Sequence, residues 1–109
     1  MVFHKHILPN VVTYNSLIHG LCNLCCWDEV SKLLKEMEDE RISLNVQTYN
    51  ILVDAVCKEG KVKDANCIIN LMIERGIDPN VVNYNSLIDG YCLRGEMSKA
   101  KEILNLMGS

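Results

Sequence analysis

Three asparagines stand 35 residues apart, each inside the same short block of sequence. The blocks read PNVVTYNSLIHG from Pro9, LNVQTYNILVDA from Leu44 and PNVVNYNSLIDG from Pro79, and the asparagines are Asn15, Asn50 and Asn85. A carboxamide carries hydrogen-bond donors and an acceptor, so it can pair with either a carbonyl or an amine on a ligand. If these side chains meet a ligand, they would recognise it through hydrogen bonds.

A second set of asparagines follows the same period, at Asn10, Asn45 and Asn80. From the residues alone, two interpretations stay open for both sets. Asparagine directly before a helix is a common N-cap, because its side-chain oxygen accepts a hydrogen bond from the first backbone amides. The other set could then be exposed first-turn residues without a ligand. The alternative is that both sets contact a ligand.

The blocks themselves repeat closely, with the first and third identical at ten of twelve positions and the first and second at six. A fixed period of this length is typical of solenoids, in which each unit packs only against its neighbours. We divide the chain into the end of a preceding repeat (1–10), repeat 1 (11–45), repeat 2 (46–80) and a truncated repeat 3 (81–109). We expect it to be a segment of a longer array.

Each repeat is predicted to contain two helices. Apolar residues recur at i, i+3, i+4 and i+7 in two stripes per repeat, for example Tyr49, Leu52, Val53 and Val56 and then Ala65, Ile68, Ile69 and Met72. This periodicity predicts an all-α fold, an α-solenoid of antiparallel helix-turn-helix repeats forming a right-handed superhelix. Gly60 and Gly95 mark the turns inside two repeats, whereas Cys25 stands there in the first, which predicts a turn that is either strained or differently shaped.

Composition argues against several classes of function. The net charge of −3 gives no general attraction to nucleic acid, so nucleic-acid binding would need locally placed groups. No apolar stretch is long enough for a membrane span. P-loop, GxSxG, HExxH and zinc-deaminase motifs are missing from the sequence. We therefore predict no enzyme activity, no cofactor, no small-molecule substrate and no membrane partner.

The six cysteines invite a metal or disulfide interpretation. Cys22, Cys57 and Cys92 lie 35 residues apart, late in the first helix of each repeat. At such a place a thiol behaves as a small buried hydrophobe. Cys22 and Cys25 have zinc-like spacing but no second pair, so we favour a structural role and predict no metal, with a zinc site or disulfide as the alternative.

The sequence resembles the pentatricopeptide repeat family. The resemblance rests on the block V-V-T-Y-N-S-L-I-x-G-x-C from Val11 to Cys22 and its echoes, on the period of 35, and on the exit I-x-P-N from Ile77 to Asn80. Tetratricopeptide repeats have a period of 34 and a Trp/Leu/Gly/Tyr pattern that is missing here. Equal periods resemble the pure-repeat class, and the phrasing resembles the plant fertility-restorer subgroup.

The resemblance implies that each repeat contacts one base of single-stranded RNA. It pairs Asn15 with Asn45 and Asn50 with Asn80 as base-reading residues with a pyrimidine preference, cytosine above uracil, and makes Asn85 a third reader. It also implies base-sandwiching by Val12, Gln47 and Val82, weakened by the polar Gln47, and phosphate contacts by Lys58 and Arg94.

Family membership would further imply that the protein acts on organellar RNA, in a mitochondrion or plastid. It would affect the processing, stability or translation of the RNA by occupying it rather than by catalysis. We expect weak RNA binding for this chain alone. Two other interpretations stay open, a helical scaffold whose groove binds a protein or peptide, and a non-functional gene fragment.

Overall fold

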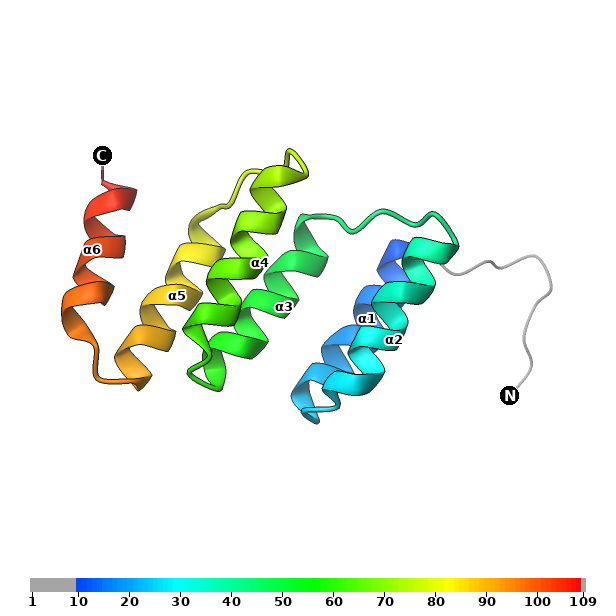
Figure 1. Cartoon of the computed structure of the whole chain (residues 1–109), viewed down its shortest axis with the longest axis horizontal. Coiled ribbons are helices and arrows are strands. Elements are labelled where there is room, and N and C mark those ends of the chain that lie inside the picture. The colour runs from blue at the N-terminus through cyan, green and yellow to red at the C-terminus, as the bar shows by residue number, and fades with distance from the viewer. Residues whose placement is uncertain (1–9, 109) are drawn as a thin grey trace. The chain divides into compact units, whose positions relative to one another are not determined.

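The computed structural model describes residues 10–108, which form helices joined by short turns and contain no strand (Figure 1). The helices are α1 (Val11–Asn23), α2 (Trp27–Asp39), α3 (Val46–Lys58), α4 (Val62–Glu74), α5 (Val81–Leu93) and α6 (Met97–Met107). This confirms the all-α class. Of the predicted preceding segment, 1–10, only Asn10 lies within the described residues. None of the described helices is long and apolar enough to cross a membrane.

The chain divides into two compact units. The first unit ends at Leu44 and contains α1 and α2, which pack against each other. Its fully buried side chains include Ile18 and Met37, one from each helix. The apolar stripes that predicted a helix pair thus meet in the core of that pair.

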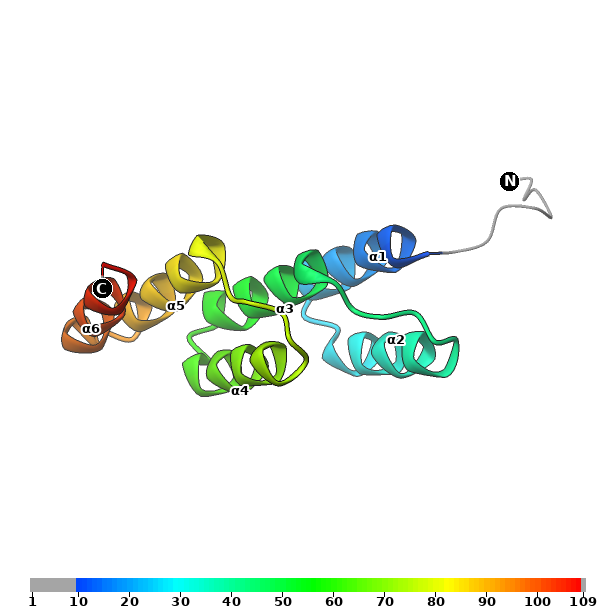
Figure 2. The ribbon, with the colours of Figure 1, turned by 90° about the horizontal axis from the view of Figure 1, so that it is seen from above.

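The second unit begins at Asn45 and contains the other four helices. Helix α3 packs against α4 and α5, and α5 packs against α4 and α6. Seen from above in Figure 2, α3 and α5 lie in one layer and α4 lies in the other. The buried core is formed by the apolar stripes, with Tyr49, Val53, Met72 and Leu87 at most 2% exposed. Equivalent helices of successive repeats therefore stack, which is the packing of a solenoid.

Helices α3 and α5 approach closely at Gly90. A Cβ atom at this position would stand 2.8 Å from Cγ1 of Val62 and 3.3 Å from Cβ of Cys57. Cys57 is 1% exposed and Cys22 is 5% exposed, as expected for thiols acting as small hydrophobes. Cys92, predicted to be buried like them, is exposed. The reason is that Cys57 is covered by the helix of the following repeat, and within the described residues no such helix follows α5.

The turns inside the repeats adopt the left-handed backbone conformation. Gly60 and Gly95 have φ values of 73° and 75°, which glycine tolerates without a steric penalty. Cys25, at the equivalent position of the first repeat, has φ of 57°. Arg41 likewise has φ of 58° where the next repeat has Gly76, at 79°. The strained turn, one of the two alternatives predicted at Cys25, is thus present in the structure.

Cys25→Gly should stabilise the first unit by up to about 1 kcal/mol, because relief of the left-handed strain exceeds the extra entropy of glycine in the unfolded chain. Urea unfolding followed by the fluorescence of Trp27, the single tryptophan and a residue of α2, measures this change. Gly60→Ala is the matched control and should destabilise the second unit. A lower urea midpoint for Cys25→Gly would contradict the strain argument.

Candidate nucleic-acid interface

Each first helix of a repeat begins at a capping asparagine. Oδ1 of Asn10 accepts a hydrogen bond from the backbone N–H of Thr13 at 3.1 Å, and Oδ1 of Asn45 accepts one from Thr48 at 3.0 Å. The threonine hydroxyl oxygens accept from the capping residues' own backbone N–H groups at 3.4 Å and 3.3 Å. These are capping boxes, so Asn10 and Asn45 cap the helices that follow them.

The third cap uses an asparagine where the others use threonine. Oδ1 of Asn80 accepts from the backbone N–H of Val82 at 3.0 Å and of Asn83 at 3.4 Å. Oδ1 of Asn83 in turn accepts from the backbone N–H of Asn80 at 2.9 Å. Capping occupies the side-chain oxygen of Asn80, and its –NH2 group remains able to donate to a ligand.

Asn83 also connects this cap to the preceding repeat. Its Nδ2 donates a hydrogen bond of 2.6 Å to Oδ1 of Asn50, a half-buried residue of α3. The buried side chain of Asn83 thus contacts both members of a predicted base-reading pair, Asn50 through its carboxamide and Asn80 through its backbone N–H. Sequence analysis missed Asn83, and the only signal for it was the replacement of a threonine that the two earlier blocks share.

The other predicted base-reading residues lie in different surroundings. Asn15 is 9% exposed and belongs to α1 in the first unit, whereas its predicted partner, Asn45, opens the second unit. Asn85 is exposed on α5. Of the two predicted pairs, Asn50 and Asn80 is the one whose members lie in the same unit.

The residues predicted to sandwich bases are all exposed in the first turn of their helices. Val12 is 65% exposed, Val82 is 46% exposed, and Gln47 is exposed at the equivalent position. Each precedes a base-reading asparagine by three residues, which puts the two side chains on the same helix face. An exposed apolar side chain beside a carboxamide offers a flat ligand both a contact surface and a hydrogen-bonding group.

The predicted phosphate residue Lys58 forms an ion pair within its own helix. Its Nζ lies 2.9 Å from Oδ2 of Asp54, whose Oδ1 accepts a hydrogen bond of 3.4 Å from Ser86 on α5. Exposed ion pairs of this kind are worth little, so the ammonium group can be shared with a phosphate at small cost.

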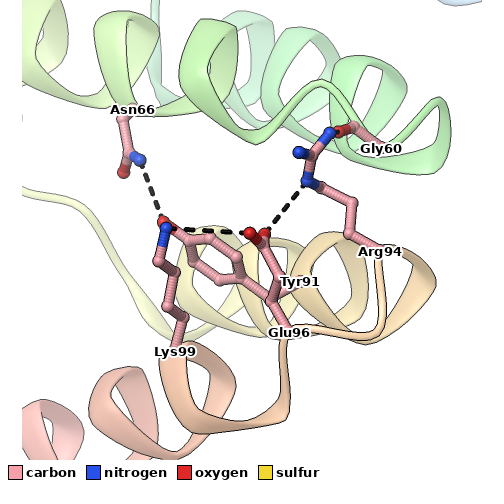
Figure 3. A network of polar contacts seen from close by, with 6 residues as sticks. All are labelled: Gly60, Asn66, Tyr91, Arg94, Glu96 and Lys99. Carbon is pink, nitrogen blue, oxygen red and sulfur yellow. Dashed lines mark hydrogen bonds and ion pairs between the residues drawn. The ribbon is translucent and has the colours of Figure 1, made fainter.

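Arg94, the second predicted phosphate residue, is part of a polar network between repeats (Figure 3). Its Nη1 donates to the carbonyl oxygen of Gly60 at 3.3 Å, and its Nε donates to Glu96 at 3.0 Å. The hydrogen bond from Arg94 lowers the pKa of the Glu96 carboxyl, and the charge of Lys99 acts in the same direction. These contacts tie the Gly60 turn to the following repeat, so the guanidinium has a structural role.

Tyr91 occupies the centre of the same network. Its hydroxyl accepts a hydrogen bond of 3.2 Å from Nδ2 of Asn66 on α4, and Nζ of Lys99 lies 5.9 Å from the ring centroid (Figure 3). Among the described residues, no group of three or more His, Cys, Asp or Glu side chains is arranged to hold a metal ion.

Comparison with known proteins gives matches along the whole described chain. A family model of the PPR repeat family matches residues 9–58 and 45–92, and a PPR repeat model matches residues 82–109. No curated protein matches significantly.

Solved structures are similar over almost all of the chain. The crystal structure of the pentatricopeptide repeat protein PPR10 from maize aligns with a TM-score of 0.77 and 28% identity, covering 95% of this chain and 15% of that one. PPR10 in complex with an 18-nt psaJ RNA element aligns with a TM-score of 0.81 and 26% identity, covering 94% and 15%. The chain therefore spans about 15% of the length of the solved structures it matches.

Proposed function

The chain belongs to the pentatricopeptide repeat family, and from this we propose that its repeats bind single-stranded RNA, one base for each pair of asparagines. The observation that carries the proposal is that one buried side chain, Asn83, contacts both members of a predicted pair, the carboxamide of Asn50 and the backbone N–H of Asn80. The similarity to PPR10 in its RNA complex supports the same assignment.

Base sandwiching by Val12, Gln47 and Val82 is part of the proposal, as is a pyrimidine preference of the Asn/Asn pairs. The exposure of Val12 and Val82 supports base sandwiching, since apolar surface on the first turn of a helix is available to the face of a base. Gln47 exposes less apolar surface than valine would, which weakens the contacts in which it takes part. Asn15 with Asn45 forms the second proposed pair, and Asn85 the third reader.

The affinity of this chain alone for RNA should be low. The net charge is −3, Lys58 is shared with Asp54, and Arg94 is engaged between repeats. Each base contact contributes about 1–3 kcal/mol, whereas association costs on the order of 4–15 kcal/mol. We therefore propose that function belongs to a longer array, which acts by occupying RNA in a mitochondrion or plastid and so affects its processing, stability or translation.

A graft tests the proposal. Residues 11–107 replace the corresponding positions of three consecutive repeats in a long array of the same family, and fluorescence anisotropy measures affinity for RNAs that differ only at the bases opposite the graft. We expect pyrimidines to bind about 5- to 100-fold tighter than purines, and the preference to be lost in Asn15→Ala/Asn50→Ala.

Equal affinity for all bases by a folded graft would reject base reading. The asparagines would then serve only as caps and surface residues, and a scaffold for protein partners would be the better assignment. Circular dichroism of the grafted array confirms that it is folded before affinities are compared.

A further inference from the structure

We infer that Asn83 is a specificity-determining residue, which holds the Asn50 carboxamide so that only its amino group is presented to a base. This inference rests on the proposed function. Asn83 itself is fully buried and touches no base; it acts through Asn50. It is a positioning residue supplied by one repeat for the base-reading residue of the repeat before it.

The backbone N–H of Asn80 fixes the orientation of both carboxamides. The backbone N–H of Asn80 can only donate, so the side-chain atom of Asn83 that lies 2.9 Å away must be Oδ1. The other terminal atom of Asn83 is then Nδ2, which can only donate. Consequently the atom of Asn50 that lies 2.6 Å from it must be Oδ1, and the remaining polar atom of Asn50 is Nδ2.

A flip of either carboxamide is disfavoured by the same contacts. Turning Asn83 would place its amino group against the Asn80 N–H, two donors facing each other, inside a fully buried site. Turning Asn50 alone would place its amino group against that of Asn83. The hydrogen-bond network thus fixes the orientation of both carboxamides.

The capping contacts fix the orientation of Asn80 as well. Its Oδ1 accepts from two backbone N–H groups, those of Val82 and Asn83, so its available group is also Nδ2. The pair therefore offers donors and no unengaged side-chain acceptor. Cytosine presents two adjacent acceptors, N3 and O2, on its Watson–Crick edge, whereas uracil has an N3–H donor between its two carbonyls. A donor-only pair favours cytosine over uracil.

Threonine at this position cannot fix a neighbouring carboxamide in the same way, because a hydroxyl both donates and accepts. Thr48, the equivalent residue one repeat earlier, already has its Oγ1 in two contacts with Asn45. The exchange of threonine for Asn83 thus converts a capping residue into one that also orients the base-reading residue of the preceding repeat.

Asn83→Asp should reverse the orientation of the Asn50 carboxamide with little change in the shape of the side chain at position 83. One carboxylate oxygen still accepts from the Asn80 N–H, and the other can only accept, so Asn50 must turn to donate its Nδ2 and present Oδ1 to the base. The ¹⁵N-labelled full chain is titrated with the RNA hexamers C6 and U6, and NMR shifts at Asn50 and Asn80 measure even millimolar affinity. Asn70→Asp, at an exposed residue of α4, controls for the added charge.

We expect the wild type and Asn70→Asp to bind C6 at least about fivefold tighter than U6, and Asn83→Asp to prefer U6. An unchanged cytosine preference in Asn83→Asp would overturn the inference and leave the proposed function standing. In the grafted array described above, equal affinity for cytosine and uracil opposite Asn50 and Asn80 in the wild type would overturn the inference, and equal affinity for all four bases would overturn the proposed function as well.

A second measurement, made on the wild-type chain without RNA, tests the same inference. Exchange of side-chain amide protons with solvent should be slow for Asn83, whose amino group is hydrogen-bonded and buried, and fast for Asn50. Slow exchange at the amino group of Asn50 in the wild-type chain would overturn the inference, whether or not Asn83→Asp folds. In a folded Asn83→Asp chain, the amino group of Asn50 should become protected.

Discussion

Gly90→Ala is expected to destabilise the second unit by about 1–2 kcal/mol, although alanine is the better helix former. The added Cβ would stand 2.8 Å from Cγ1 of Val62 and 3.3 Å from Cβ of Cys57, closer than unstrained contacts allow. Overpacking of this kind costs about 1–3 kcal/mol, and the gain from replacing glycine inside a helix offsets about 0.5–1 kcal/mol of it. Urea unfolding followed by circular dichroism at 222 nm measures the difference.

Gly20→Ala is the matched control, because Gly20 occupies the same repeat position and no described neighbouring atom lies within 4 Å of the place its Cβ would take. It should stabilise the chain by about 0.5–1 kcal/mol. Val62→Ala removes the nearer of the two clashing groups, so Gly90→Ala should cost less in a Val62→Ala background. If Gly90→Ala and Gly20→Ala stabilised the chain equally, the close approach of α3 and α5 would be refuted.

Features set within one repeat could be predicted from the sequence. The period located the helix pairs, because apolar stripes recur at the same offset in every repeat and form the cores described above. Aligning Cys25 with Gly60 and Gly95 predicted a strained or differently shaped turn, since the backbone conformation of a turn depends on its place in the repeat. Capping by Asn45 and Asn80 was one of two alternatives that the residues left open, and it is local as well.

Features that depend on contacts between repeats could not be predicted in the same way. Cys92 shares the repeat position of Cys57 but is exposed, because burial there requires the next repeat. The resemblance implied a phosphate contact for Arg94, and the hydrogen bond of its guanidinium to the carbonyl of Gly60, 34 residues back, was not predicted. Asn83 looked like a variant of a capping threonine, and its contact with Asn50 follows from the stacking of α5 on α3.

These contacts have a consequence for how specificity is encoded in the array. Asn50 and Asn80 belong to repeat 2, but Asn83, whose side chain contacts the Asn50 carboxamide and the Asn80 backbone N–H, belongs to repeat 3. Under the proposed function, the base preference of a repeat would therefore depend on the cap of its neighbour as well as on its own two asparagines. Grafts that end before residue 83 would remove this contact and should be compared with longer ones.

The Cys57 thiol should resist alkylation in the folded chain by a factor on the order of 1,000 relative to an exposed cysteine. Burial, and secondarily the charges of Asp54 and Asp89, raise its pKa from 9.0 to about 12. Only the thiolate reacts, so at pH 8 its reactive fraction falls by that factor. Cys67 and Cys92, exposed in the same unit, are internal controls. Iodoacetamide labelling read by peptide mass spectrometry measures each site.

The same shift predicts how stability depends on pH. Because the pKa of Cys57 is higher in the folded state than in the unfolded chain, the folded state retains the proton more tightly. This contribution to the free energy of unfolding is complete below about pH 9 and is lost as the pH rises towards 12. The urea midpoint should therefore fall more steeply between pH 8 and pH 10.5 in the wild type than in Cys57→Ala, which lacks the thiol. Two results would contradict burial of the Cys57 thiol beneath Gly90. One is a urea midpoint that depends on pH in the same way in the wild type and in Cys57→Ala. The other is a labelling rate of Cys57 in the folded chain that lies within tenfold of the rate of Cys92.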